Sequence, residues 1–358
     1  MRGQLVLLCS VFLFIGCKKN NQEKTNTSSI YYPPSNSAIW ETVSPSSLGW
    51  NEAELADLDN FLDLKKTKAF IILKDGRIAR ERYFGTFTAD STWYWASAGK
   101  TLTAFLVGIA QQQGKLDISD KTSKYLGTGW TSLPLIKENL ITIRHQLTMT
   151  TGLDDYVPDN DCTQASCLMY KADAGTRWSY HNAPYTLLEK VVEQATSTTY
   201  NMFFQQSLRD KIGMNGMWIK NGFNNVYFST PRSMARFGLL LLSKGKWKEN
   251  IVLSDTNYLR AQLNSSQDLN LSYGYLTWLN GKTNYKLPQT QMTFNGALIP
   301  NAPADTYAAL GKNDQKLYVV PSLNLVVIRM GESAGNVHLA SSSFDNELWG
   351  KLRQVLKL

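Results

Sequence analysis

The stretch Trp95-Ala-Ser97-Ala-Gly-Lys100-Thr-Leu-Thr-Ala104 determines how the rest of the sequence is interpreted. An apolar run from Leu102 to Gln113 follows, and together they predict a helix that Ser97 opens. Residues three apart in a helix lie on one face, so we expect Lys100 beside Ser97. A serine hydroxyl needs such a base to become a nucleophile. At the helix N-terminus, its backbone N–H can also help to bind an oxyanion.

The residues around Ser97 and Lys100 are stronger evidence for an active site than the spacing of the two residues. A lysine acts as a base only when burial or a neighbouring cation lowers its pKa, and Trp93, Tyr94 and Trp95 could supply that burial. Ser243 and Lys246 have the same spacing, but they stand in a polar turn at the end of an apolar helix. With no helix N-terminus behind it, we interpret this second copy as a coincidence.

A second polar segment, Gly175 to Asn182, precedes a predicted helix over residues 184–194. Tyr180 and Asn182 are two apart, so in an extended segment both can face one site. A phenol near a lysine ammonium ionises more easily and can move a proton, and an amide can hold both lysine and substrate. Without Ser97 and Lys100, this pattern would be read only as a surface loop before a helix.

Taken together, these segments resemble the serine beta-lactamase and penicillin-binding superfamily. The closest branch holds class C beta-lactamases, DD-peptidases, esterases and 6-aminohexanoate-dimer hydrolases. The resemblance covers about residues 46–358, and the stretches Ile141–Leu153 and Ser233–Leu239 share it. It implies that Ser97 is the acylated nucleophile and Lys100 its proton partner. It also implies that Tyr180 is the base and that it also protonates the leaving group. Asn182 would be the supporting amide, and no metal or organic cofactor would be needed.

The third motif of that superfamily departs from its usual pattern. The matching strand here is Tyr307–Gln315, in which Gly311 fits the usual glycine and the Lys312 N–H would be the second oxyanion donor. The position that normally carries a cation, for the carboxylate of penicillins and peptidoglycan stems, is Ala309. The resemblance therefore favours an esterase or amidase over a beta-lactamase or carboxypeptidase.

Strand and helix patterns predict an α+β fold. A hairpin is expected over residues 69–84 around Asp75-Gly76, with further strands over 273–279, 306–310, 315–320 and 323–330. Helices are expected at both ends of the body, over residues 50–64 and 344–356. We expect an antiparallel sheet flanked by these N- and C-terminal helices, with an inserted, mostly helical subdomain at about 118–240.

The N-terminus predicts export. Arg2 precedes the apolar run Leu5–Ile15, which is too short to span a bilayer and is followed by Gly16-Cys17. This resembles a bacterial lipoprotein signal over residues 1–16, with lipidation at Cys17 and a flexible tether over 17–45. The protein would then be anchored in the bacterial cell envelope, facing the periplasm or the exterior. An ordinary secretory signal is the alternative.

The charge and the cysteines limit the classes of partner that the protein could bind. The formal net charge is +8, but the basic residues are scattered and do not outline a nucleic-acid site. Cys162 and Cys167 in a polar segment most simply form a local disulfide after export, and a metal site is the rival interpretation. We expect His145 to be a buried or capping residue, and His181 to point away from Tyr180 and Asn182.

The sequence thus predicts a serine hydrolase that cleaves a small ester or amide through an acyl-enzyme on Ser97. A DD-peptidase or beta-lactamase acting on peptidoglycan or penicillins is the alternative within the same chemistry. The other alternative, from a different class, is a non-catalytic envelope binding or sensor protein that keeps the fold.

Overall fold

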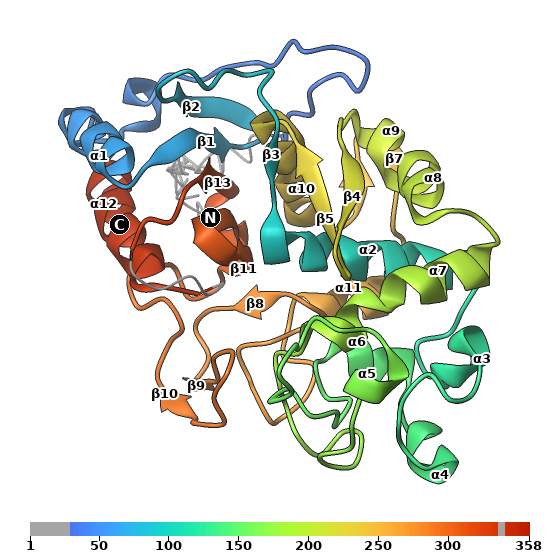
Figure 1. The fold of residues 1–358 in the computed structure, drawn as a ribbon. Coiled ribbons are helices and arrows are strands. Elements are labelled where there is room, and N and C mark those ends of the chain that lie inside the picture. The colour runs from blue at the N-terminus through green and yellow to red at the C-terminus, as the bar shows by residue number, and fades with distance from the viewer. Residues whose placement is uncertain (1–28, 336–340) are drawn as a thin grey trace, which may run out of the picture.

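The computed structural model describes residues 29–335 and 341–358. An antiparallel sheet at its centre has the strand order β2-β1-β13-β12-β11-β8 (Figure 1). Its strands are β1 (Thr67–Lys74), β2 (Arg77–Tyr83), β8 (Trp278–Leu279), β11 (Tyr307–Gly311), β12 (Gln315–Val320) and β13 (Leu325–Gly331). The predicted hairpin is confirmed: Asp75 and Gly76 both have a positive φ, as this kind of two-residue turn requires.

Helices cover both faces of the sheet. Alternate strand residues point to opposite faces, so Leu317 and Tyr318 of β12 identify the two sides. On one side, the Tyr318 hydroxyl donates to Asp345 of α12 (Ser343–Leu356), and α1 (Ala53–Leu64) packs beside α12 (Figure 1). On the other side, α10 (Pro231–Leu242) lies so close that a Cβ on Gly238 would be 2.6 Å from Leu317. The predicted α+β class with terminal helices is therefore confirmed.

Helix α2 (Gly99–Gln112) contacts both the sheet and the remaining helices (Figure 1). Every residue from Gly99 to Ala110 is buried. It follows directly on a short 3₁₀ turn, Ala96–Ala98, that contains Ser97. Because α2 is enclosed on all sides, the residues at its start are held rigidly, and Ser97 and Lys100 are among them.

The helical part beside α2 consists of short segments. They are α3 (Ser123–Leu126), α4 (Leu135–Glu138), α5 (Ile143–Leu147), α6 (Asn182–Thr186), α7 (Leu188–Thr196), α8 (Tyr200–Phe204) and α9 (Asp210–Ile212). A small sheet adjoins them, in the order β3 (Trp93–Tyr94), β5 (Asn224–Ser229), β4 (Met217–Asn221). α10 falls almost wholly within the predicted subdomain range of 118–240, but it packs on the large sheet.

The remaining elements connect the helical part to the end of the sheet. They are β6 (Lys246–Trp247), β7 (Asn250–Ile251), α11 (Thr256–Gln262), β9 (Asn284–Tyr285) and β10 (Phe294–Asn295). The strand predicted over residues 273–279 is reduced to β8, because Leu276 adopts a left-handed backbone conformation that interrupts an extended chain.

The prediction of a flexible tether is wrong for residues 29–45. The Tyr31 N–H donates to Asp75 O at 3.0 Å, and the Arg236 guanidinium donates to the carbonyls of Pro34 and Ser37 at 2.9 and 3.0 Å. The segment is thus fixed to the body by backbone groups that its polar composition does not reveal. The rest of the predicted tether, the signal peptide and Cys17 lie outside the described residues.

Candidate active site

A cleft of about 970 Å³ opens at the start of α2. Five of the six residues that the sequence placed in the site line this cleft. The sixth, Gly311, immediately precedes Lys312 in the chain. The lining residues comprise two segments around the nucleophile, the β4–β5 hairpin and isolated side chains: Tyr94, Ala96, Ser97, Lys100, Asn160, Asp161, Tyr180, Asn182, Tyr185, Asn221, Asn224, Asn225, Val226, Phe228, Pro288, Gln289 and Lys312.

Ser97 and Lys100 are in direct contact. The Lys100 ammonium donates to Ser97 Oγ at 3.0 Å. The 3₁₀ turn at Ala96–Ala98, with Ala96 at a positive φ, presents Ser97 to the cleft while Lys100 points to it from the first turn of α2. The geometry is that of a nucleophile and its base.

Aromatic rings enclose the Lys100 ammonium. Its Nζ lies 4.2 Å from the ring centre of Tyr185 and 5.1 Å from that of Tyr180, and only 4% of the residue is exposed. Burial lowers the pKa of Lys100 from 10.5 to about 7, and the Asp161 carboxylate opposes that shift. A substantial fraction of Lys100 is therefore neutral near pH 7 and can accept the serine proton. The rings against the ammonium are thus those of the two tyrosines, and of the aromatic residues proposed from the sequence to enclose the site, Tyr94 lines the cleft.

Tyr180 behaves differently from the sequence-based expectation. Its ring stacks on Trp278 with centroids 5.7 Å apart. Burial raises the Tyr180 pKa well above its usual value of 10, and the nearby Ser97 hydroxyl only partly offsets this. The two hydroxyls do not meet with normal hydrogen-bond geometry, and among the described residues the Tyr180 oxygen has no hydrogen-bond partner. Tyr180 is thus a neutral phenol in the free protein, able to donate a proton but not poised to remove one.

Asn182 begins α6 and faces the cleft beside Tyr180. Its Nδ2 donates to Asp161 Oδ1 at 2.7 Å. Sequence reasoning missed both Asp161 and Tyr185. Tyr185 stands three residues after Asn182, on the same face of α6, and that spacing could have indicated it. Asp161 offered only its position next to Cys162, which is no signal for a site.

Gly311 lets β11 lie directly against the Ser97 turn. A Cβ at this position would be 2.4 Å from Trp95 O and 3.0 Å from Ala98 N, so no other residue fits without movement. Lys312 follows with its side chain exposed and lining the cleft, while Ala309 is buried in the sheet and does not line it. The cleft thus has a cation at Lys312, three residues beyond Ala309, the position where the superfamily pattern has one.

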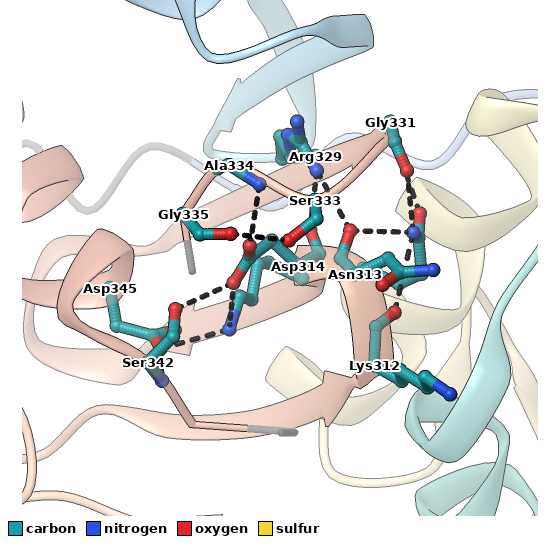
Figure 2. A network of polar contacts seen from close by, with 12 residues as sticks. Lys312, Asn313, Asp314, Arg329, Gly331, Ser333, Ala334, Gly335, Ser342 and Asp345 are labelled. Atoms are coloured by element: carbon teal, nitrogen blue, oxygen red, sulfur yellow. Dashed lines mark hydrogen bonds and ion pairs between the residues drawn. The ribbon is translucent and has the colours of Figure 1, made fainter. Parts of the chain in front are cut away.

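A buried polar network fixes the turn that carries Lys312 (Figure 2). Asn313 and Asp314 both adopt left-handed conformations. The Gln315 side chain donates to Asn313 O and Gly331 O, and Arg329 donates to the carbonyls of Asn313 and Asp314. In Figure 2 the Lys312 side chain points away from this network. These hydrogen bonds to the carbonyls of the turn hold the Lys312 backbone in one conformation.

Comparison with known proteins agrees with this geometry. The family model for beta-lactamase matches residues 66–341, which is most of the chain. The chain belongs to the beta-lactamase family. Membership of this family supports an enzyme of the serine hydrolase type, working through an acyl-enzyme.

Individual relatives of this beta-lactamase family member are distant. An uncharacterised protein of Alkalihalophilus pseudofirmus is 24% identical, over 77% of this chain and 89% of that protein. A beta-lactamase of Providencia stuartii is 30% identical, but the match spans only 42% of this chain and 37% of that enzyme.

Solved structures show the same fold. A candidate beta-lactamase from Bacteroides dorei superimposes with a TM-score of 0.67 at 16% identity, covering 86% of this chain and all of that one. A candidate 6-aminohexanoate-dimer hydrolase from Bacillus anthracis also gives 0.67 at 16% identity, covering 91% and 89%.

Other residues considered from the sequence lie outside the cleft. His145 forms a capping box with Thr142 at the start of α5, and His181 is buried away from the cleft lining. Ser243 accepts a hydrogen bond from the Tyr32 hydroxyl, so the second Ser-x-x-Lys copy has a structural contact. Cys162 and Cys167 form a disulfide, which excludes them as metal ligands. Among the described residues, no helix is long and apolar enough to cross a bilayer.

Proposed function

We propose that this family member hydrolyses a small ester or amide through an acyl-enzyme on Ser97. The observation that carries the proposal is the 3.0 Å contact between Ser97 Oγ and the ammonium of a lysine whose pKa burial lowers to about 7. A base with a pKa near the working pH has the greatest effect on proton transfer. A solvated lysine would be protonated at that pH and could not act as the base.

The steps follow from the positions of the groups. Neutral Lys100 takes the Ser97 proton as Oγ attacks the substrate carbonyl. The backbone N–H groups of Ser97 and Lys312 bind the oxyanion that forms. Neutral Tyr180 donates its proton to the leaving group and regains one from Lys100, whose ammonium lies against its ring. Water then attacks the acyl-enzyme with the same groups, and Asn182 supports lysine and substrate.

A test of the nucleophile uses a fluorophosphonate probe on wild type and Ser97→Ala. We expect a covalent adduct on wild type, located at Ser97 by peptide mass spectrometry, and none on the variant. A folded wild-type protein that gives no adduct would favour the non-catalytic binding or sensor alternative.

A panel of substrates tests which class of compound the protein hydrolyses. Nitrophenyl esters and linear amides should be turned over faster than a cephalosporin or a D-Ala-D-Ala peptide, since Ala309 gives no cation at the usual carboxylate-binding position. Turnover of the D-Ala-D-Ala peptide alone would reject the esterase or amidase proposal.

One observation favours the second candidate, a beta-lactamase or DD-peptidase. Lys312 is exposed and lines the cleft, so it brings an ammonium there. That ammonium could bind a substrate carboxylate in place of the missing cation. If Lys312→Gln raises KM for carboxylate-bearing substrates and leaves KM for neutral esters unchanged, the second candidate gains support.

We also propose that the protein is lipid-anchored through Cys17 in the cell envelope. The support is the N-terminal sequence alone, in which a short apolar run precedes Gly16-Cys17. Metabolic labelling with a fatty acid should mark wild type and not Cys17→Ser. An unlabelled wild type would leave the ordinary secretory signal as the better interpretation.

A further inference from the structure

Asp161 lines the cleft and stands immediately before the disulfide-closed loop Cys162–Cys167. The Asp161 N–H donates to Asp159 Oδ1 at 3.0 Å, and the next residue is Cys162, bonded to Cys167. The preceding residue, Asn160, accepts a hydrogen bond at 3.1 Å from the N–H of Ala183, in the first turn of α6. The loop and the segment that carries Asn182 are therefore joined by backbone as well as by side chains.

The contact from Asn182 to Asp161 fixes which way the Asn182 amide faces. A carboxylate can only accept, so the amide nitrogen must point to Asp161 Oδ1, which it reaches at 2.7 Å. The reverse orientation would set two oxygens against each other. The Asn182 carbonyl oxygen is consequently turned away from Asp161, and it is buried with no hydrogen-bond partner among the described residues. It is available as an acceptor for a donor within the cleft.

Asp161 also supplies the only carboxylate among the described residues that line the cleft. The groups facing Lys100 are otherwise the hydroxyl of Ser97 and the rings of Tyr180 and Tyr185, with the Lys312 ammonium in the same cleft. The nearest acid of α7, Glu189, is paired with Lys220 at 3.0 Å. Among the described residues that line the cleft, Asp161 is therefore the one counter-charge for a protonated Lys100.

We infer that Asp161 is a positioning residue of this active site, which orients the Asn182 amide and stabilises the ammonium form of Lys100. The inference rests on the proposed function. It assigns Asp161 no contact with the reacting atoms, and it implies two separable effects. The hydrogen bond sets the geometry of Asn182, and the negative charge sets the pH range in which Lys100 is a base.

Two substitutions separate the effects. Asp161→Asn keeps an oxygen that can accept from Asn182 and removes the charge, whereas Asp161→Ala removes both. The matched control is Asp154→Asn, which removes the same charge from a residue of the preceding segment that does not line the cleft. The measurement is the pH dependence of kcat/KM for a neutral nitrophenyl ester, with fluorophosphonate labelling and thermal unfolding of each protein.

In Asp161→Asn we expect the acid limb of the profile to move to lower pH by about one unit, with a plateau close to wild type. Asp161→Ala should show the same shift and a plateau about tenfold lower, as expected for one lost hydrogen bond. Asp154→Asn should match wild type. A folded, labelled Asp161→Asn with the wild-type limb would overturn the inference and leave the proposed function intact. A wild type without a Ser97 adduct would instead reject the proposed function.

Discussion

At the scale of single residues, the chemistry depends on one lysine made unusual by its neighbours. Lys100 sits against Tyr185 and Tyr180, which exclude water without supplying a counter-charge. The same burial that lowers the lysine pKa raises that of Tyr180, so the two groups hold opposite roles. Groups whose pKa values are driven apart are suited to act as base and acid in one reaction.

The lowered lysine pKa predicts the pH profile. Lys100 is active when neutral, so kcat/KM should rise with pH through about 7 and reach a plateau above it. Below this pKa, kcat/KM should fall about tenfold for each pH unit, as for a single titrating group. Lys100→Arg, which stays protonated, should be inactive throughout. An acid limb in wild type above pH 9 would show that burial does not lower the Lys100 pKa, since an unshifted lysine titrates there.

The buried lysine should also cost stability. Its pKa is lower in the folded than in the unfolded protein, so the charged form destabilises the fold fully below pH 7. This penalty declines as pH rises from 7 to 10.5, where both states become neutral. Lys100→Met should therefore raise the free energy of unfolding by about 2 kcal/mol at pH 6, and by less at pH 10. Urea denaturation at both pH values measures this free energy of unfolding.

The control for this prediction is Lys115→Met, at an exposed position just after the end of α2. Its free energy of unfolding should stay within about 0.5 kcal/mol of wild type. A Lys100→Met variant less stable than wild type at pH 6 would mean that the ammonium is favourably paired rather than desolvated.

At the scale of elements, the site depends on β11 meeting the Ser97 turn. Only glycine at position 311 permits this approach. Gly311→Ala should displace the Lys312 N–H from the oxyanion site, lowering the rate of fluorophosphonate labelling by at least about tenfold and stability by about 1–3 kcal/mol.

Gly335→Ala is the control for that substitution, since a Cβ there meets nothing within 4 Å. It should leave the labelling rate unchanged. Wild-type labelling by Gly311→Ala would place the second oxyanion donor somewhere other than Lys312.

The disulfide-closed loop gives a second prediction at this scale. Replacing both Cys162 and Cys167 by Ser should loosen the segment that carries Asp161. We expect kcat/KM at the plateau to fall about tenfold, as in Asp161→Ala, with the acid limb moved in the same direction. A chemically reduced wild type, verified by mass, should behave alike. An unchanged profile in the reduced protein would show that the loop keeps its form without the bond.

Sequence patterns succeed here where one local rule decides, and fail where distant segments meet. The β1–β2 hairpin follows from a turn dipeptide, and α12 follows from an amphipathic run at the predicted residues 344–356. Asp161 and Tyr185 escaped notice because their importance comes from what folds against them. Residues 29–45 have a linker-like composition, yet backbone carbonyls of that segment satisfy Arg236, a contact that no local pattern encodes.

At the scale of the whole molecule, the sheet is joined to the C-terminal helix by buried charges. Lys316 of β12 bonds Asp345 of α12 at 2.9 Å and Asp314 at 3.2 Å, with both Lys316 and Asp314 fully buried. Asp314 also accepts from Ser342 at 2.6 Å (Figure 2). The turn that presents Lys312 is therefore tied to the start of α12.

Removing one member of this cluster should destabilise the entire fold. Asp345→Ala removes one of the two carboxylates described beside Lys316 and deprives Tyr318 of its acceptor. We expect a loss of about 3–5 kcal/mol in urea denaturation. Asp57→Ala, which breaks the exposed pair with Lys351, should cost less than about 1 kcal/mol. Equal losses in the two variants would contradict a structural role for the buried cluster.

The tie between α12 and the Lys312 turn has a consequence for biosynthesis. The two groups proposed to bind the oxyanion are separated by more than half of the polypeptide, and the turn of the second gains its contact with Ser342 only after α12 has docked. A chain that is still emerging from the ribosome therefore has Ser97 before the Lys312 turn gains this support. We expect the proposed hydrolysis to reach its full rate only once α12 has docked.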